Sequence, residues 1–156
     1  MPGIKRYFAS DEIISIRYRM NKGLNKIEHM KMIQSIIERM SRNSFALKGW
    51  VVTLVAGIFV LSDKDADRTY FFIAYIPIII FWGIDSYYLL KERLFRKLYN
   101  NVRCKEDSQI DFNMDTSDFG QKRDYLKAVF SKSELGFYFP LALVATCIAM
   151  MHLLWK

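Results

Sequence analysis

The chain has 156 residues, of which 52% are hydrophobic and 15% are aromatic, and its formal net charge is +7. Long apolar stretches take up about 60 residues, which leaves too little chain for a separate enzyme domain of ordinary size. In such a chain, the first interpretation of the net positive charge is that basic residues mark the cytoplasmic side of a membrane, and binding of nucleic acid is the second.

The first predicted element is an amphipathic helix between Glu12 and Asn43. Ser10 or Asp11 can cap its start, and Gly23 favours a break within it. Its apolar stripe packs on the chain's own cytoplasmic helices, on a neighbouring subunit or on the inner leaflet. Apolar residues recur at spacings of three or four at Ile13, Ile16, Met20, Leu24, Ile27, Met30, Ile33, Ile37 and Met40.

Three apolar stretches follow, at Phe45–Ser62, Thr69–Leu90 and Leu135–Trp155. A helix needs about 20 mostly apolar residues to cross the hydrocarbon of a bilayer. The second and third stretches reach this length, and the first reaches it if Lys48 extends its charge to the interface. We therefore predict an all-α membrane protein with three transmembrane helices and a cytoplasmic helical region.

The charges between these stretches predict the orientation. Residues 1–44 carry nine Lys or Arg against four Asp or Glu, and residues 91–134 carry ten against eight. The basic excess places both segments in the cytoplasm, so that the short loop at 62–69 and the C-terminus lie outside. Residues 1–44 are then a cytoplasmic amphipathic region, and residues 91–134 a cytoplasmic helical stalk with a polar loop.

The second apolar stretch continues without a helix breaker into charged sequence, which predicts one helix over Thr69–Arg103. The acidic segment after it alternates briefly between polar and apolar residues, which indicates either an extended segment or a loop of two turns. A short helix over Lys122–Phe130 is expected before the third stretch.

Asp85 is the residue that most strongly indicates a function. A carboxylate within a membrane is unfavourable in free energy, so it marks a partner or an ion path. Counted from the loop between the first two stretches, Lys48 lies at nearly the same depth and is the expected partner. The pair is either a structural salt bridge or a pore-lining gate. Pro77 is expected in the middle of the second span, where it would kink the helix, either as a gate hinge or as a structural kink.

Small residues on the first span, Gly49, Thr53 and Gly57, are spaced four apart and favour close packing of helices within or between subunits. Trp50 and Trp82 match in depth, which indicates an aromatic belt at the inner interface.

A set of basic residues on the cytoplasmic side has aromatic residues interleaved with it. In an oligomer these charges would form a ring able to bind phosphates, while tyrosines stack on bases. Contact with lipid headgroups is the competing interpretation. The candidate ligand-binding residues are Arg39, Arg42, Arg93, Arg96, Lys97, Tyr99 and Arg103.

Motifs for catalysis and for cofactors are absent from the sequence. The segment that begins at Asp111 resembles a calcium-binding loop, but it has Thr116 where the turn needs Gly and Lys122 where the bidentate Glu belongs. His29 and His152 are expected on opposite sides of the membrane, so they form no metal pair. We predict no enzyme, no cofactor and no metal site.

The runs NSFALKGWVVTLVAGIF and PIIIFWGIDSYYLLKERLFRKLYNNVR resemble a family of small bacterial membrane proteins. The family includes proteins similar to the octameric RipA membrane protein and SLATT-like membrane effectors of anti-phage systems. The resemblance is closest to the membrane effector of Hailong-type systems and covers roughly residues 33–103.

The resemblance implies a homo-oligomer in the bacterial inner membrane that works with a nucleotidyltransferase. The signal would be a cyclic nucleotide or a short single-stranded DNA oligomer, and the outcome would be membrane disruption in abortive infection. We therefore expect an oligomeric channel gated from the cytoplasm. The alternatives are a non-conducting scaffold that organises partner proteins or lipid, and a small transporter subunit.

Overall fold

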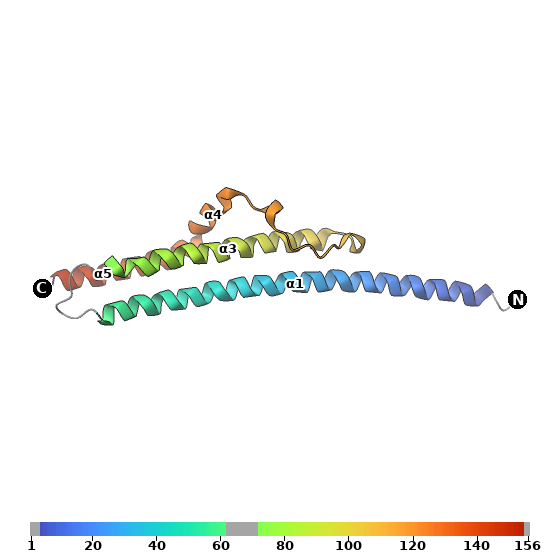
Figure 1. Ribbon diagram of the computed structural model, residues 1–156, viewed down its shortest axis with the longest axis horizontal. Coiled ribbons are helices and arrows are strands. Elements are labelled where there is room, and N and C mark those ends of the chain that lie inside the picture. Colours follow the sequence, from blue (N-terminus) through green and yellow to red (C-terminus); the bar gives the residue numbers. More distant parts are fainter. Residues whose placement is uncertain (1–3, 62–71, 155–156) are drawn as a thin grey trace.

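The computed structural model describes residues 4–61 and 72–154 of the chain. The described residues are helical apart from turns and irregular loop, and they form no strand. Two long helices, α1 and α3, lie side by side and antiparallel, and α5 lies against them at the end that holds the C-terminus (Figure 1). The expected all-α fold is therefore confirmed.

Helix α1 runs without interruption over Ile4–Leu61, a length of 58 residues. At 1.5 Å per residue it is about 87 Å long. No proline occurs between its ends, and Gly23 does not break it, because one glycine costs a helix interior only about 1 kcal/mol. The amphipathic segment and the first apolar stretch, which the sequence analysis treats separately, are thus one rigid rod.

Helix α3 runs over Tyr75–Cys104 and joins apolar to charged sequence, as expected for residues 75–103. Residues 69–71 lie outside the described residues. The apolar part of α3 ends at Leu90, because Lys91, Glu92 and Arg93 follow in succession.

The prediction of three spanning helices is corrected here. Within the described residues, only the helices α1 and α5 contain a stretch long and apolar enough to cross a membrane. Helix α3 does not meet this requirement. Its apolar part, Tyr75–Leu90, is shorter than the roughly 18–20 residues that a span needs, and its charged half follows directly. The two apolar helices support a membrane location.

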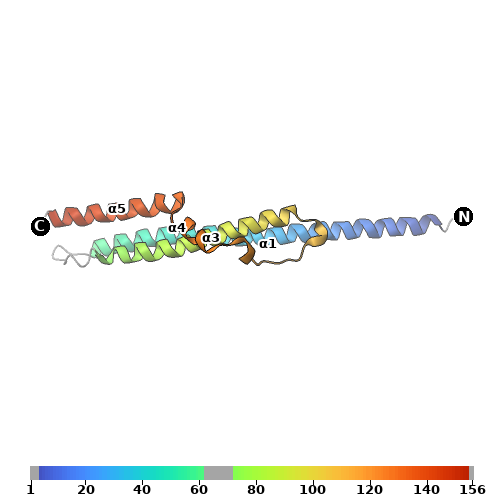
Figure 2. The same ribbon diagram turned by 90° about the horizontal axis from the view of Figure 1, so that it is seen from above.

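The segment between α3 and α5 is a compact loop with one short helix. Two 3-10 turns, η1 (Asp107–Gln109) and η2 (Ser117–Phe119), form the loop, so the two-turn interpretation is the right one. The short helix α4 spans Lys122–Val129, as predicted, and lies on the side of α3 away from α1 (Figures 1 and 2).

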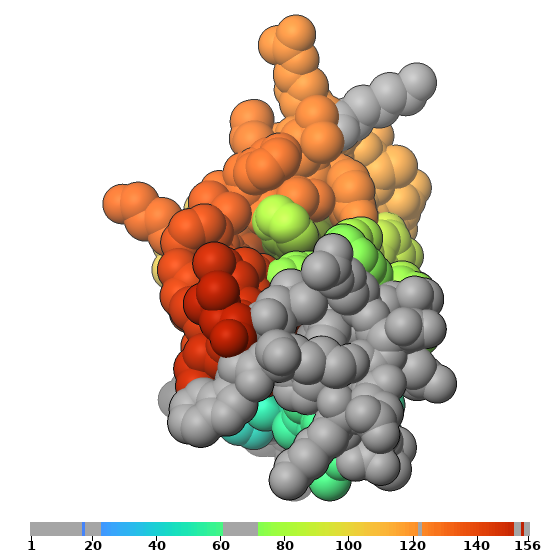
Figure 3. Space-filling model, turned by 90° about the vertical axis from the view of Figure 1, so that its left-hand side faces the viewer, coloured from blue at the N-terminus to red at the C-terminus, as the bar shows by residue number. Residues whose placement is uncertain are grey.

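Helix α4 begins at a reciprocal cap. The Gln121 side chain accepts from the backbone at Asp124, and the Gln121 backbone N–H donates to Asp124 Oδ2 at 3.1 Å. Helix α5 follows over Lys132–Leu154 and contains Pro140. Seen from the end of the molecule, α5 lies beside α3, with the loop and α4 on the side of α3 opposite α1 (Figure 3).

Two separate apolar clusters hold the helices together. The first joins α1, α3 and α5 and is built from Val51, Val55, Ile78, Tyr138 and Ala145. It lies among the apolar stretches of α1 and α5, and we call it the inner cluster.

The second cluster, which we call the outer cluster, joins the N-terminal half of α1 to the charged half of α3. Ile33, Leu98 and Val102 are its buried members, and Ile110 and Met114 from the loop pack on it. The apolar stripe of α1 is therefore covered by the chain's own helices at Ile33, while Leu24 and Ile27 on the same helix remain more than half exposed.

The position of Pro77 also differs from the prediction. Helix α3 begins at Tyr75, so Pro77 lies in its first turn, after a turn at Ala74 that separates α3 from the helical residues 72–73. A proline at a helix start removes no helical hydrogen bond, because the first N–H groups have no partner within the helix. Helix α5 holds Pro140 in its interior and still runs continuously over Lys132–Leu154.

Candidate functional site: a buried charge cluster

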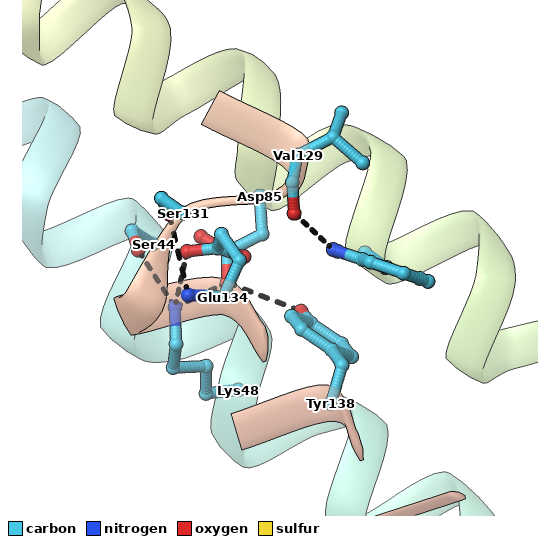
Figure 4. A network of polar contacts seen from close by, with 8 residues as sticks. Ser44, Lys48, Asp85, Val129, Ser131, Glu134 and Tyr138 are labelled. Atoms are coloured by element: carbon cyan, nitrogen blue, oxygen red, sulfur yellow. Dashed lines mark hydrogen bonds and ion pairs between the residues drawn. The ribbon is translucent and has the colours of Figure 1, made fainter. Parts of the chain in front are cut away.

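Three charged side chains from three helices meet between the inner and outer clusters (Figure 4). Lys48 of α1 forms an ion pair with Asp85 Oδ2 of α3, and its Nζ lies 3.3 Å from Glu134 Oε1 of α5. We call these three residues the charge cluster. The side chain of Asp85 is 0% exposed and that of Glu134 is 1% exposed, so the carboxylates are removed from water.

The ammonium group of Lys48 has all three of its donors engaged. Besides the two carboxylates, Nζ donates to Ser44 Oγ at 3.1 Å. An ammonium group has three donors and no acceptor, so this arrangement satisfies it completely. The rings of Phe137 and Tyr138 lie 5.7 and 5.9 Å from Nζ and add cation–π attraction.

The carboxylates, in contrast, are only partly satisfied. Asp85 Oδ2 accepts a second hydrogen bond, from the Tyr138 hydroxyl at 3.1 Å. Asp85 Oδ1 and Glu134 Oε2 are buried and accept no hydrogen bond within the described part of the chain. The cluster therefore combines one positive charge with two negative charges and leaves two acceptor atoms unused.

Aromatic packing fixes the geometry around the cluster. Tyr138 stacks on Trp82 with ring centroids 6.1 Å apart, and Trp82 Nε1 donates to the Val129 carbonyl at 3.1 Å. Trp82 is thus part of the internal packing between α3, α4 and α5, whereas Trp50 is 65% exposed. The two tryptophans thus differ in burial, and the aromatic belt stays a prediction.

The expected partnership of Lys48 with Asp85 is present, but the sequence analysis missed Glu134. Ser131, Lys132, Ser133 and Glu134 form the S-x-x-E pattern that marks a helix start, and the Glu134 N–H points to Ser131 Oγ at 3.4 Å. Had this pattern set the helix start, Glu134 would have been counted in the third apolar helix. Its position in the first turn of α5 favours its negative charge through the helix dipole.

The predicted basic residues do not form one surface. Arg96 and Tyr99 line a groove of about 440 Å³ between α1 and α3, together with Gln34, Glu38 and other residues. Arg96 is already paired, because its guanidinium lies 2.8 Å from Glu92 on the same helix. The groove therefore offers amide and aromatic groups more than free positive charge.

The other basic candidates point elsewhere. Arg93 and Lys97 reach the α4 side, where Lys97 donates to the Phe119 carbonyl at 2.9 Å and lies 3.7 Å from Asp124. Arg39, Arg42 and Arg103 are exposed. The structure thus separates residues that the sequence analysis grouped together, because α3 presents successive residues to different neighbours.

A second feature that the sequence did not reveal fastens the loop to α1. His29 is fully buried, its Nε2 lies 3.2 Å from the Asn113 carbonyl oxygen, and its ring lies 5.3 Å from Phe112. Lys26 donates to the Lys105 carbonyl at 2.6 Å. Phe112 has a φ of 54°, a left-handed conformation uncommon for a bulky residue.

Local hydrogen bonds set the acidity of the loop carboxyls. A hydrogen bond from the Asn113 backbone lowers the pKa of Asp111, and one from the Ser117 backbone lowers the pKa of Asp115. The side chain of Lys127 and the backbone of Gln121 lower the pKa of Asp124. Each of these carboxyls is thus held in its ionised form by neighbours that order the loop and the start of α4.

No family model matches the chain, and no curated protein or solved structure is similar to it. The resemblance to membrane effectors therefore remains a prediction that rests on the quoted sequence runs. The fold and the charge cluster stand on the geometry of the chain itself.

Proposed function

We propose that this chain is the oligomeric membrane effector of a bacterial anti-phage system, a channel gated by a nucleotide or oligonucleotide signal in the cytoplasm. The observation that carries the proposal is the charge cluster. Lys48 and Glu134 belong to the two helices that are apolar enough to span a membrane, and Asp85 of α3 joins them. A charged group within a membrane is costly, and by default it marks a partner or an ion path.

In this proposal the chain lies in the inner membrane. The N-terminal half of α1 and the loop segment lie in the cytoplasm, and the C-terminus lies outside. The loop and the charged half of α3 pack beside the middle of α1, and the N-terminal part of α1 extends beyond them, away from the C-terminus (Figure 1). A nucleotidyltransferase would make the signal, and ion leakage would halt the infected cell.

One face of α1 supports self-assembly. A Cβ atom placed on Gly49 or Gly57 would meet nothing within 4 Å, so this small-residue face is uncovered in the single chain. Faces of small residues let helices approach closely in a membrane. A neighbouring subunit packed there would place several charge clusters around one axis.

The groove at Arg96 and Tyr99 is the proposed place for the signal. Its amides, at Gln34 and Asn100, and its tyrosine suit the edge and the face of a base. A ligand in the groove would contact α1 and α3 together and would bias their packing, provided that it binds one state better than the other.

The test is ion flux from liposomes that contain the purified full chain, with and without short single-stranded DNA and cyclic nucleotides. We expect flux that one of these ligands switches on or off. The matched variants are Tyr99→Ala in the groove and Tyr87→Ala, an exposed tyrosine of the same helix. The first should abolish ligand dependence and the second should leave it. Flux that ignores every ligand would overturn the gating proposal.

A non-conducting scaffold is the second candidate, and the pairing of the basic residues favours it. Arg96 is held by Glu92, and Lys97 is held by the Phe119 carbonyl, so neither is free to bind phosphate without losing a contact. A scaffold predicts tight liposomes under all conditions from a correctly assembled protein. Neutral replacement of Arg96 and Lys97 would then alter partner recruitment without changing ion leakage.

A further inference from the structure

The negative charge of the charge cluster exceeds the positive charge that its surroundings supply. Lys48 supplies one positive charge, while Asp85 and Glu134 each supply one negative charge if both are ionised. The N-terminus of α5 adds only about half a positive elementary charge. A net negative charge on two carboxylates that are removed from water is unfavourable, so a further cation is needed to balance them.

The unused acceptors show where such a cation binds. Asp85 Oδ1 and Glu134 Oε2 are both buried, and neither accepts a hydrogen bond from the described residues. The two carboxyl groups bind the same Lys48 nitrogen, so they repel each other when both are ionised. One proton therefore supplies the missing positive charge, and it also supplies a partner for at least one of the two unused acceptors.

The surroundings of the site favour a proton over a metal ion. Metal cations of the hard type take six or more oxygen ligands. Here the Lys48 ammonium already lies between the carboxylates and would repel a second compact cation. The titratable groups that face Glu134 are Lys48 from α1, Asp85 from α3 and Tyr138 from α5 itself.

We propose that the charge cluster is a proton-binding site, in which one proton held by the Asp85–Glu134 carboxyl pair neutralises the contact between α5 and the α1–α3 pair. Binding forms one O–H bond on a carboxylate oxygen with a proton taken from water, and the charge of the cluster changes from minus one to zero. This inference concerns the cluster alone and holds whether or not the chain conducts ions.

Binding of the proton affects the contact between α5 and α3. Glu134 and Tyr138 reach the cluster from the first turns of α5, and farther along this helix Thr146 pairs with Tyr75 of α3 at 2.6 Å. When the proton leaves, the two carboxylates repel each other across the α3–α5 contact. The proton is thus expected to hold the start of α5 against α3.

The experiment is infrared spectroscopy of the full chain in lipid nanodiscs across a pH series. A protonated carboxylic acid has a carbonyl band well separated from that of a carboxylate. We expect one buried protonated carboxyl per chain, whose band disappears as the pH is raised. The variant Glu134→Gln should abolish this band, because one carboxylate and one ammonium need no proton. The matched control Glu92→Gln, in the exposed pair with Arg96, should leave it unchanged.

Three results would overturn the proposal. The first is the lack of a protonated carboxyl band at any pH of the series, and the second is a band that persists in Glu134→Gln. The third is a band that sodium or potassium displaces at constant pH, which would identify a metal cation as the occupant. If Glu134→Gln does not fold, Asp85→Asn removes the other carboxylate and should also abolish the band.

Discussion

The Tyr138 hydroxyl of α5 donates a hydrogen bond to Asp85 Oδ2 of α3 at 3.1 Å, the same oxygen atom with which Lys48 of α1 forms its ion pair. A single carboxylate oxygen thus connects three helices that are far apart in the sequence. This arrangement makes the stability of the helix assembly depend on a few polar atoms, and it can be tested residue by residue.

Replacement of Lys48 by methionine should destabilise the protein strongly. The change keeps the length of the side chain but leaves two buried carboxylates without their cation, which costs about 3–5 kcal/mol when one partner of a buried pair is removed. Chemical unfolding in detergent measures the difference. Lys31→Met, at an exposed position of α1, is the control and should change stability little. Equal stability of the two variants would show that the cluster does not support the fold.

Removal of the Tyr138 hydroxyl should have a smaller effect. Tyr138→Phe keeps the stacking on Trp82 but leaves Asp85 with one hydrogen bond fewer, at a cost of about 1–3 kcal/mol. The thermal unfolding midpoint of the full chain reports this change. Tyr87→Phe, on the exposed side of α3, provides the comparison, and a midpoint that falls as far in that variant would contradict the assigned role of Tyr138.

Truncation of Ile33 should loosen the outer cluster. Ile33 is fully buried against Leu98 and Val102, so Ile33→Ala removes packed methyl groups and should cost about 2–5 kcal/mol. We expect faster amide exchange in residues 105–121, because the loop rests on this cluster through Ile110 and Met114. Ile27→Ala makes the same change at a site that is 52% exposed. Unchanged exchange in the Ile33 variant would mean that the loop does not depend on this packing.

The start of α4 should weaken in acid. The pKa of Asp124 is lowered in the folded protein, first by the Lys127 side chain and then by the Gln121 backbone. A lowered folded pKa gives stability that is present above the unfolded pKa and is lost as pH falls through the folded pKa. We expect amide exchange in α4 to rise as Asp124 takes up its proton.

The variant Lys127→Met separates the two causes. It removes the hydrogen bond at 3.1 Å between Lys127 Nζ and Asp124 Oδ1, so the pKa of Asp124 should rise toward its ordinary value. A carboxyl-carbon NMR titration measures the shift. Lys132→Met, outside this pair and just beyond α4, should leave the pKa of Asp124 where it is.

Removal of the His29 contact should release the loop from α1. His29→Leu introduces an apolar side chain of similar bulk and leaves the Asn113 carbonyl without this hydrogen bond. We expect faster proteolytic cleavage within residues 105–121 while the helical content stays the same. A cleavage rate equal to that of the unaltered chain would show that Lys26 and the outer cluster fasten the loop by themselves.

The sequence by itself determined most of the secondary structure. The spacing of apolar residues at three and four indicates α1, and the uninterrupted passage from apolar to charged sequence indicates α3. The distance of Lys48 and Asp85 from the connecting loop was enough to pair them, because an antiparallel pair of helices places residues equally far from the turn at the same depth. These features depend on the spacing of apolar and charged residues along the chain, which can be read from the sequence without knowledge of the tertiary structure.

Only the tertiary structure decided which residues share an environment. Glu134 joins the charge cluster because α5 starts at Lys132 and packs on α3, and no local pattern states where one helix lies on another. Pro77 lies at the start of α3, which begins two residues before it, and the basic residues separate because α3 has different neighbours on its different faces. Helix formation is a property of neighbouring residues, whereas burial and pairing depend on contacts between segments far apart in the chain.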